Sequence, residues 1–241
     1  MALGILGKKV GMTQIFNQEG NIVPVTVIEA GPCPVLQIKT KEKEGYSAVQ
    51  IGFQEKKESK TIKPLLGHCK KANAKPQRFI KEFRVDKPEE FKLGQEVKVD
   101  IFAPSDCIDV IGVSIGKGFQ GGVKRHHWAG GPESHGSMHH RAPGSIGASS
   151  DPSRTYKGQK LPGRMGNIRS TVQNLEVISI DKDNNILVVK GCVPGSDNGL
   201  LIIRRAKKKA KVLPKKKPIV KKKKEEAKAK KPAAAKSAGK K

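Results

Sequence analysis

Residues 114–169 read SIGKGFQGGVKRHHWAGGPESHGSMHHRAPGSIGASSDPSRTYKGQKLPGRMGNIR and show neither the 3.6-residue period of an amphipathic helix nor the two-residue period of a strand. This stretch holds 12 of the 26 glycines and five of the six histidines in the chain. An unstructured segment of such length in a compact domain is usually functional or disordered. Larger side chains are nevertheless scattered through it, namely Phe119, Trp128, Ile146, Tyr156 and Met165. We therefore interpret it as a functional arm that interrupts a domain.

The segments on both sides of this arm have the patterns of short strands. Residues 12–16 and 22–28 flank a turn at residues 17–20 and predict a hairpin. Pro24 and Pro34 favour edge or bulge positions. Further strands are predicted at residues 35–39, 48–53, 79–85, 97–102, 107–115, 172–180, 186–190 and 200–204. The pattern predicts a mainly β fold, a small β-barrel whose sequence the arm divides.

One short helix is predicted, at residues 64–72. It has Pro64 at its first position and places Leu65, Leu66 and Cys69 on one face. The expected organisation has four parts: residues 1–113 as the first part of the barrel with this helical insertion, 114–169 as the arm, 170–205 as the closing strands, and 206–241 as a disordered tail rich in Lys, Ala and Pro.

The positive charge of the chain is concentrated in two segments. The formal net charge is +26, from 48 Lys and Arg against 22 Asp and Glu. Residues 204–241 hold 19 basic and 2 acidic residues, and the arm holds 9 basic and 2 acidic residues. The rest of the chain is therefore close to neutral, and the excess calls for a polyanionic partner. The tail itself fits either a solubilising extension or a segment that becomes ordered on RNA.

The composition of the arm is typical of RNA binding. Glycines allow close approach of the backbone to phosphates, and basic residues recur every few positions along an extended path. Histidines and Trp128 offer flat surfaces for unpaired bases or donors for phosphate and ribose. The predicted RNA-binding residues are Lys117, Lys124, Arg125, His126, His127, Trp128, His135, His139, His140, Arg141, Ser145, Arg154, Lys157, Lys160, Arg164 and Arg169.

Three sharper interpretations of the arm are disfavoured. Residues 116–121 match the dinucleotide fingerprint G-x-G-x-x-G, but the following residues are not expected to open a helix and no acidic residue lies at the expected spacing. His135 and His139 could share a metal ion only on a helix, which Gly136 and the nearby prolines oppose. Glu133 and Asp151 are the only carboxylates of the arm, so catalysis is not expected. We predict no cofactor, no metal and no small-molecule substrate.

The remaining sequence features indicate a cytoplasmic protein. Four isolated cysteines, Cys33, Cys69, Cys107 and Cys192, are expected to be small buried hydrophobic residues in a reducing compartment. Lys8 and Lys9 interrupt the apolar run at the N-terminus and argue against a signal peptide. No stretch approaches the ~20 apolar residues of a membrane span, so no membrane partner is expected.

Three motifs resemble the universal large-subunit ribosomal protein L3 family in its bacterial form. They are GILGKKVGMTQIF at residues 4–16, GKGFQGGVKRHHW at residues 116–128 and HRAPGSIGASSDPSRTYKGQKLPGRMGN at residues 140–167. The resemblance covers residues 1–205 in the family's order. The lysine-rich extension after Arg205 is additional to the family pattern and inherits no role.

The resemblance implies a structural protein and no enzyme. It implies a translation-factor-like barrel on the subunit surface and direct, early binding of 23S rRNA near its 3′ end. The arm would reach towards the peptidyl transferase centre, with residues 144–152 innermost, and neighbouring large-subunit proteins would be further partners. Some bacterial members carry a methylated glutamine after Gly-Ser-Ile-Gly, but this chain has Ala148 there. The alternative that the charge alone leaves open is a nonspecific, nucleoid-type nucleic-acid-binding protein.

Overall fold

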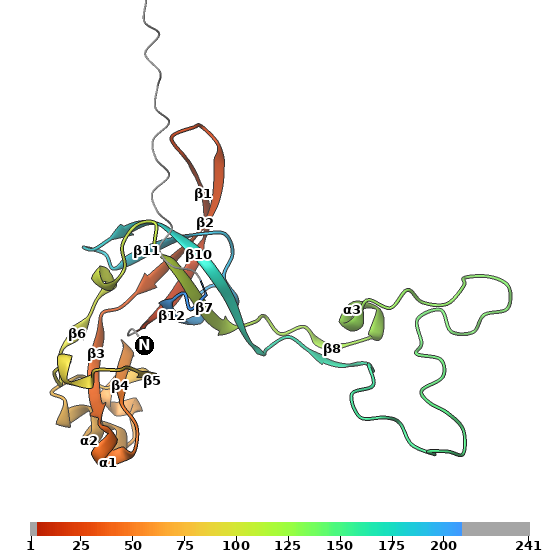
Figure 1. The fold of residues 1–241 in the computed structure, drawn as a ribbon, viewed down its shortest axis with the longest axis horizontal. Helices are drawn as coiled ribbons and strands as arrows, with labels where there is room; N and C mark the ends of the chain where they lie inside the picture. The colour runs from red at the N-terminus through yellow and green to blue at the C-terminus, as the bar shows by residue number, and fades with distance from the viewer. Residues whose placement is uncertain (1–3, 209–241) are drawn as a thin grey trace, which may run out of the picture.

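A computed structural model describes residues 4–208 of the chain, which are mainly β-structure as predicted (Figure 1). Six strands form a closed barrel in which β1 pairs with β2 at one side and with β12 at the other. In spatial order they are β1 (Ile5–Phe16), β12 (Leu200–Arg205), β7 (Cys107–Val113), β10 (Arg169–Asp181), β11 (Ile186–Lys190) and β2 (Ile22–Ala30). The barrel thus takes strands from both sides of the arm, and the predicted hairpin of residues 12–28 lies within the β1–β2 pair.

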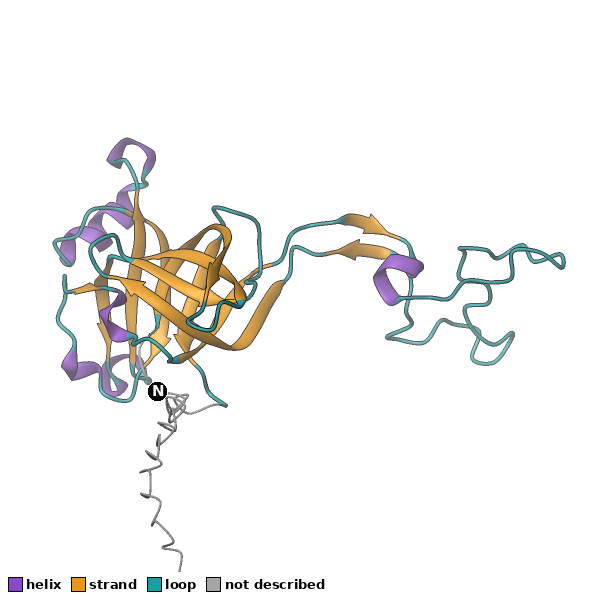
Figure 2. Ribbon diagram, turned by 90° about the horizontal axis from the view of Figure 1, so that it is seen from above, coloured by secondary structure: helices purple, strands orange, loops and turns teal. Residues whose placement is uncertain are grey.

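A second sheet packs beside the barrel, together with most of the short helices (Figure 2). Its strand order is β5 (Gln77–Arg84), β4 (Ala48–Glu55), β3 (Cys33–Lys39) and β6 (Glu96–Val97). The helical segments on this side are α1 (Lys41–Glu44), α2 (Lys63–Lys71) and the 3-10 turns η1 (Glu58–Lys60), η2 (Pro88–Glu90) and η3 (Val99–Ile101).

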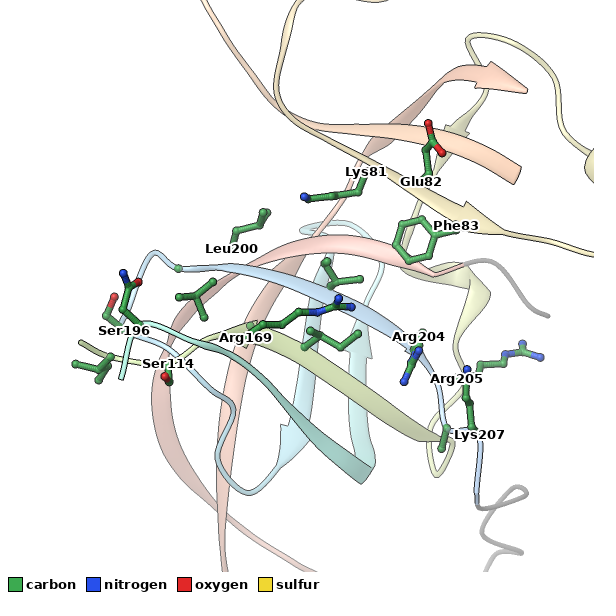
Figure 3. A pocket seen from close by; sticks show the side chains of 18 of the residues that line it. Lys81, Glu82, Phe83, Ser114, Arg169, Ser196, Leu200, Arg204, Arg205 and Lys207 are labelled. Carbon is green, nitrogen blue, oxygen red and sulfur yellow. The ribbon is translucent and has the colours of Figure 1, made fainter. Parts of the chain in front are cut away.

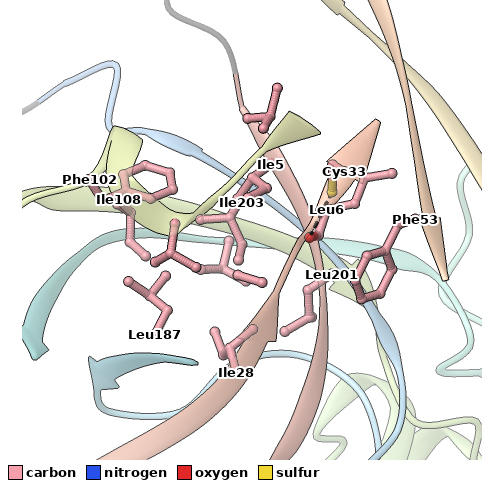
Figure 4. Packing of buried hydrophobic residues seen from close by; sticks show 14 of the residues in the cluster. Ile5, Leu6, Ile28, Cys33, Phe53, Phe102, Ile108, Leu187, Leu201 and Ile203 are labelled. Carbon is pink, nitrogen blue, oxygen red and sulfur yellow. Dashed lines mark hydrogen bonds between the residues drawn. The ribbon is translucent and has the colours of Figure 1, made fainter. Parts of the chain in front are cut away.

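One apolar cluster joins the barrel to the second sheet (Figure 4). In β12, Leu201 and Ile203 are fully buried, whereas the residues between and around them are partly exposed, as the pleat of a strand requires. Phe53 of the second sheet belongs to the same cluster. Full burial of each such side chain contributes about 1.5–3 kcal/mol, so this shared core fixes the two sheets to each other.

A polar cluster ties the strands of the second sheet together at their exposed ends. The Lys39 ammonium lies 2.7 Å from a Glu82 carboxylate oxygen, and the Tyr46 hydroxyl donates to the other oxygen at 2.9 Å. The hydrogen bond from Lys39 holds the pKa of the Glu82 carboxyl below its usual value, and the same contact raises the pKa of Lys39. Both groups therefore stay charged at neutral pH and link β3 to β5 across β4.

Several local predictions were wrong. The described residues contain three α-helices where one was predicted, because α1 and the arm helix α3 (Gly122–His126) are too short to show a hydrophobic period. The strand predicted at residues 97–102 ends at Val97 and continues as the turn η3. In α2, which matches the predicted helix closely, Leu65 is solvent-exposed and only Cys69 is buried.

The cysteines divide into two kinds. Cys33, Cys69 and Cys107 are buried as predicted, and burial raises the pKa of the Cys33 thiol to about 12. That thiol therefore remains protonated and unreactive at neutral pH. Cys192 is exposed, contrary to the prediction, because it lies in the loop between β11 and β12 and not in a strand.

We expect Leu187→Ala to lower the free energy of unfolding by about 2–5 kcal/mol, because Leu187 is fully buried in the barrel and its loss leaves a cavity. Leu93→Ala is the matched control, since Leu93 is 56% exposed, and it is expected to change stability by less than about 0.5 kcal/mol. Urea denaturation of both variants measures the difference. Equal effects would contradict the assignment of the core to the barrel interior.

Candidate nucleic-acid interface

Residues 114–169 leave the barrel and extend far from it before returning (Figures 1 and 2). The pairing of Val113 with Arg169 is the last rung between β7 and β10. Just beyond it, the Ser114 amide donates to the Ile168 carbonyl at 2.9 Å and the Asn167 amide donates to the Ser114 carbonyl at 3.1 Å. The two ends of the arm therefore depart side by side.

The arm continues as a two-stranded stalk. Strands β8 (Gly118–Gln120) and β9 (Gly163–Met165) pair antiparallel, and the Lys117 amide donates to the Met165 carbonyl at 2.9 Å. Gly166 adopts a left-handed φ of +73°, and a Cβ there would lie 2.1 Å from the Ile115 carbonyl oxygen. Only glycine permits this close crossing. Three-residue strands show no usable period, which is why the sequence pattern did not reveal the stalk.

A compact elbow, made of Gly122, Arg125, His126, Trp128 and Leu161, joins the stalk to the distal loops. The Trp128 ring lies against Gly122, where an added Cβ would come within 2.0–2.3 Å of three ring carbons. The His126 and Trp128 rings stack with centroids 6.3 Å apart. Arg125 donates to the Leu161 carbonyl at 2.6 Å, and His126 Nε2 lies 3.1 Å from the same oxygen. The elbow therefore fixes the outgoing chain to the returning chain.

This geometry divides the predicted RNA-binding residues into two groups. Arg125, His126 and Trp128 are half-buried and make contacts inside the arm. The other predicted residues are exposed: Lys117, Lys124, His127, His135, His139, His140, Arg141, Ser145, Arg154, Lys157, Lys160, Arg164 and Arg169. Most of these lie on the stalk and the distal loops, where cations and flat rings face outward.

The distal loops, residues 129–160, contain no helix or strand. The Gly131 amide donates to the His139 carbonyl at 3.2 Å, and a Cβ on Gly130 would lie 2.6 Å from the His140 carbonyl oxygen. The chain therefore folds back on itself at residues 130–140. His135 and His139 lie in this loop and not on one face of a helix. Within residues 4–208, no group of three or more His, Cys, Asp or Glu side chains is placed to hold a metal ion.

The dinucleotide motif needs one correction. A helix, α3, does begin directly after residues 116–121, contrary to the prediction that none would open there. It has only five residues, and the strand before it, β8, pairs antiparallel with β9. A dinucleotide fold needs a parallel βαβ unit, so the topology still disfavours that interpretation.

A basic groove lies at the base of the arm (Figure 3), with a volume of about 1180 Å³. Exposed apolar side chains such as Val113 and Ile115 contribute to its lining. Its one carboxylate, Glu82, is already paired with Lys39. The cations that line it are Lys81, Arg84, Arg169, Arg204, Arg205 and Lys207.

Sequence reasoning missed five of these six cations. Lys81 and Arg84 stood within a predicted strand, and the cations from Arg204 to Lys207 were counted with the tail. Only the packing of the second sheet beside the barrel brings these two segments into one groove. The available signal was the run QRFIKEFR, whose three exposed cations include Lys81 and Arg84.

Comparison with known proteins agrees with the motifs. The family model described as ribosomal protein L3 matches residues 80–185, which include the whole arm. The large ribosomal subunit protein uL3 of Pelotomaculum thermopropionicum is 56% identical over 206 residues, covering 86% of this chain and 98% of the relative. The protein of the same name from Carboxydothermus hydrogenoformans gives the same values, and that of a Geobacillus strain is 54% identical with 86% and 97% covered.

The chain belongs to the ribosomal protein L3 family. The resemblance seen in the three sequence motifs is thereby confirmed. Proteins of this family are structural constituents of the ribosome and not enzymes. No helix within the described range is both long and apolar enough to cross a membrane.

We expect Gly122→Ala to displace Trp128 from the elbow, because the new methyl group would overlap the indole ring. Trp128 is the single tryptophan of the chain, so its fluorescence emission should move to longer wavelength as the ring becomes solvated. Gly121→Ala is the control, since nothing lies within 4 Å of a Cβ at that position. An unchanged emission maximum in Gly122→Ala would contradict the packing of the elbow.

Proposed function

We propose that this L3-family chain binds large-subunit ribosomal RNA directly, through its arm, as a structural constituent of the subunit. The observation that carries the proposal is the combination of charge and exposure in the distal loops. They bear Arg141, Arg154, Lys157 and Lys160 and are held by few internal contacts. A segment without a core of its own gains order from a partner that surrounds it, and packed RNA offers phosphate on every side.

Within this proposal the two groups of residues have different roles. The exposed cations, histidines and Ser145 contact phosphate, ribose or unpaired bases. Arg125, His126 and Trp128 act as positioning residues, because they hold the elbow that aims the distal loops. The basic groove extends the same site onto the barrel, since Ser114, Ile115 and Asn167 at the base of the arm line it. RNA packed around the stalk would pass the mouth of this groove.

The finer placement follows from the family. We propose that the RNA is 23S rRNA near its 3′ end, bound early in assembly, and that the arm reaches towards the peptidyl transferase centre. Residues 144–152 lie in the distal loops, far from the barrel along the chain, which supports their assignment as the innermost part. Ala148 in that segment excludes the glutamine methylation known in relatives.

The domain organisation is proposed on the same basis. Residues 1–113 and 170–205 would form one translation-factor-like barrel unit, divided by the arm of residues 114–169. Strands β7 and β10 meet at the boundaries of the arm, which supports this division. The predicted disorder of residues 206–241 concerns a tail of which residues 209–241 lie outside the described residues.

A second candidate function, nonspecific nucleic-acid binding of the nucleoid type, is favoured by the net charge of residues 204–241. The two functions differ in what they require of the arm. Nonspecific binding requires only its charge, whereas a threaded arm also requires the order of its glycines, prolines and histidines.

Replacing Arg154, Lys157 and Lys160 by Gln should weaken binding to large-subunit rRNA and reduce the steepness of its salt dependence. The logarithmic slope should fall by about 2–3, since each phosphate contact contributes about 0.7–0.9. The control replaces Lys43, Lys57 and Lys60, three exposed lysines outside the arm, by Gln. Filter binding across a salt series measures both variants. Identical slopes would rule out the distal loops as the binding segment.

Scrambling residues 144–152 at constant composition separates the two candidate functions. We expect the scrambled protein to retain nonspecific affinity for RNA but to impair assembly of large subunits, measured by sucrose-gradient profiles of cells that depend on the variant. Normal subunit profiles would favour the nonspecific function, because charge and composition are unchanged.

A further inference from the structure

The tip of the β1–β2 pair projects beyond the barrel wall (Figure 1). Strand β1 pairs with β12 only from Ile5 to Lys8, and β2 pairs with β11 only from Val25 to Glu29. The two strands stay paired with each other as far as Phe16 and Ile22. The last contact of β2 with the neighbouring chain is the hydrogen bond that the Gly191 amide donates to the Pro24 carbonyl at 2.9 Å. Residues 10–23 therefore form a two-stranded ribbon beyond the barrel wall, here called the projecting hairpin.

One face of the projecting hairpin carries three exposed apolar side chains, with the exposed Gln14 between two of them. Met12 and Phe16 lie on the same face of β1 because they are an even number of residues apart, and Ile22 pairs directly with Phe16. The three side chains are 51%, 67% and 59% exposed, in that order. Single exposed apolar residues are ordinary, but a cluster of them on an isolated ribbon marks an interaction surface. A two-stranded ribbon is also only marginally stable without a partner.

The charge of the projecting hairpin argues against RNA as that partner. Residues 10–25 contain no Lys or Arg and a single acidic residue, Glu19, in a chain with 48 basic residues. Binding to RNA depends on cations that neutralise phosphates. A surface without any cation, and with an aromatic and two aliphatic side chains exposed, matches a protein partner.

The outer edge of β1 offers unpaired backbone groups. The Lys9 amide donates to the Gly199 carbonyl at 3.0 Å, and within the described residues no strand pairs with this edge from residue 10 onward. The Asn17 amide donates to the Asn21 carbonyl at 3.0 Å, so the alternation of an antiparallel pair turns the amides of Met12, Gln14 and Phe16 outward. Pro24 pairs with Gln14 at a position where the backbone nitrogen points away from β1. Its lack of an N–H therefore removes no hydrogen bond between the two strands. Such an edge accepts an additional strand.

We propose that the projecting hairpin is a docking site for an extended segment of another protein of the large subunit. The segment adds as a strand to the outer edge of β1, and its apolar side chains cover Met12, Phe16 and Ile22. This inference rests on membership of the ribosomal family and not on the proposed role of the arm.

Photo-cross-linking in assembled subunits tests the proposal. Benzoylphenylalanine replaces Phe16 in one variant and Phe119 in the other; Phe119 is 77% exposed and lies in the basic arm, which makes it a control with identical chemistry. We expect position 16 to form adducts with a peptide of another large-subunit protein and position 119 to form adducts with RNA, as identified by mass spectrometry of purified, irradiated subunits.

Each outcome separates the two proposals. Adducts of position 16 with RNA, with a second copy of this chain or with its own residues 209–241 would overturn the docking site, as would no adduct at all. Adducts of position 119 with protein alone would count against the RNA-binding arm and leave the docking site standing.

Hydrogen exchange on the unmodified protein tests the strand geometry without any substitution. We expect the amides of Met12, Gln14 and Phe16 to exchange at least tenfold more slowly in the subunit than in the free protein. The amides of Thr13 and Ile15, which face β2, serve as the internal control and should change less. Unchanged exchange at the three outward amides would overturn the added strand.

Discussion

Closure of the barrel requires β7 and β10 to pair, although the whole arm separates them in sequence. Strand β7 also pairs with β12, and β1 and β2 pair with β12 and β11, so each N-terminal strand of the barrel pairs with at least one C-terminal strand. The entropic cost of closing such a loop rises by only about 0.6 kcal/mol for each doubling of its length. The shared apolar core can therefore tolerate a long insertion, and the same pairing sets the two ends of the arm side by side and points the stalk away from the barrel.

The elbow extends that order outward. Residue types that suit RNA, an arginine, a histidine and a tryptophan, are used there to hold the two halves of the arm together. Gly122 makes this possible because it leaves room for the indole ring. Beyond the elbow, the chain has few internal contacts, and its side chains face solvent. Internal hydrogen bonding thus decreases from the barrel to the distal loops, and these loops carry the four exposed cations Arg141, Arg154, Lys157 and Lys160.

The length of each element, and whether its contacts are local, decided what the sequence could and could not predict. Strands with a clear apolar alternation or run, such as β12 and β2, and the proline-initiated helix α2 were predictable from local pattern. The helix α3 and the strands β8 and β9 were not, since elements of three to five residues carry no period. The basic groove was beyond local reasoning because Lys81 of the second sheet and Arg204 of the barrel line one groove only in the folded chain. The run IVPVTVI predicted a strand, but it did not indicate where the pairing of that strand with β11 ends. The sequence therefore gave no sign of the projecting hairpin.

The surface of the protein is consequently sorted by charge. Cations gather on the arm and in the groove at its base, while the projecting hairpin has none. Adding lysines to the hairpin would raise its solubility and blunt its open edge, which is the usual protection of an exposed strand. Their absence, in a chain so rich in lysine, leaves an edge and an apolar face suited to pairing with protein and unsuited to phosphate. The proposed RNA-binding arm and the proposed docking hairpin therefore differ chiefly in charge, because the cations that would attract phosphate are absent from residues 10–25.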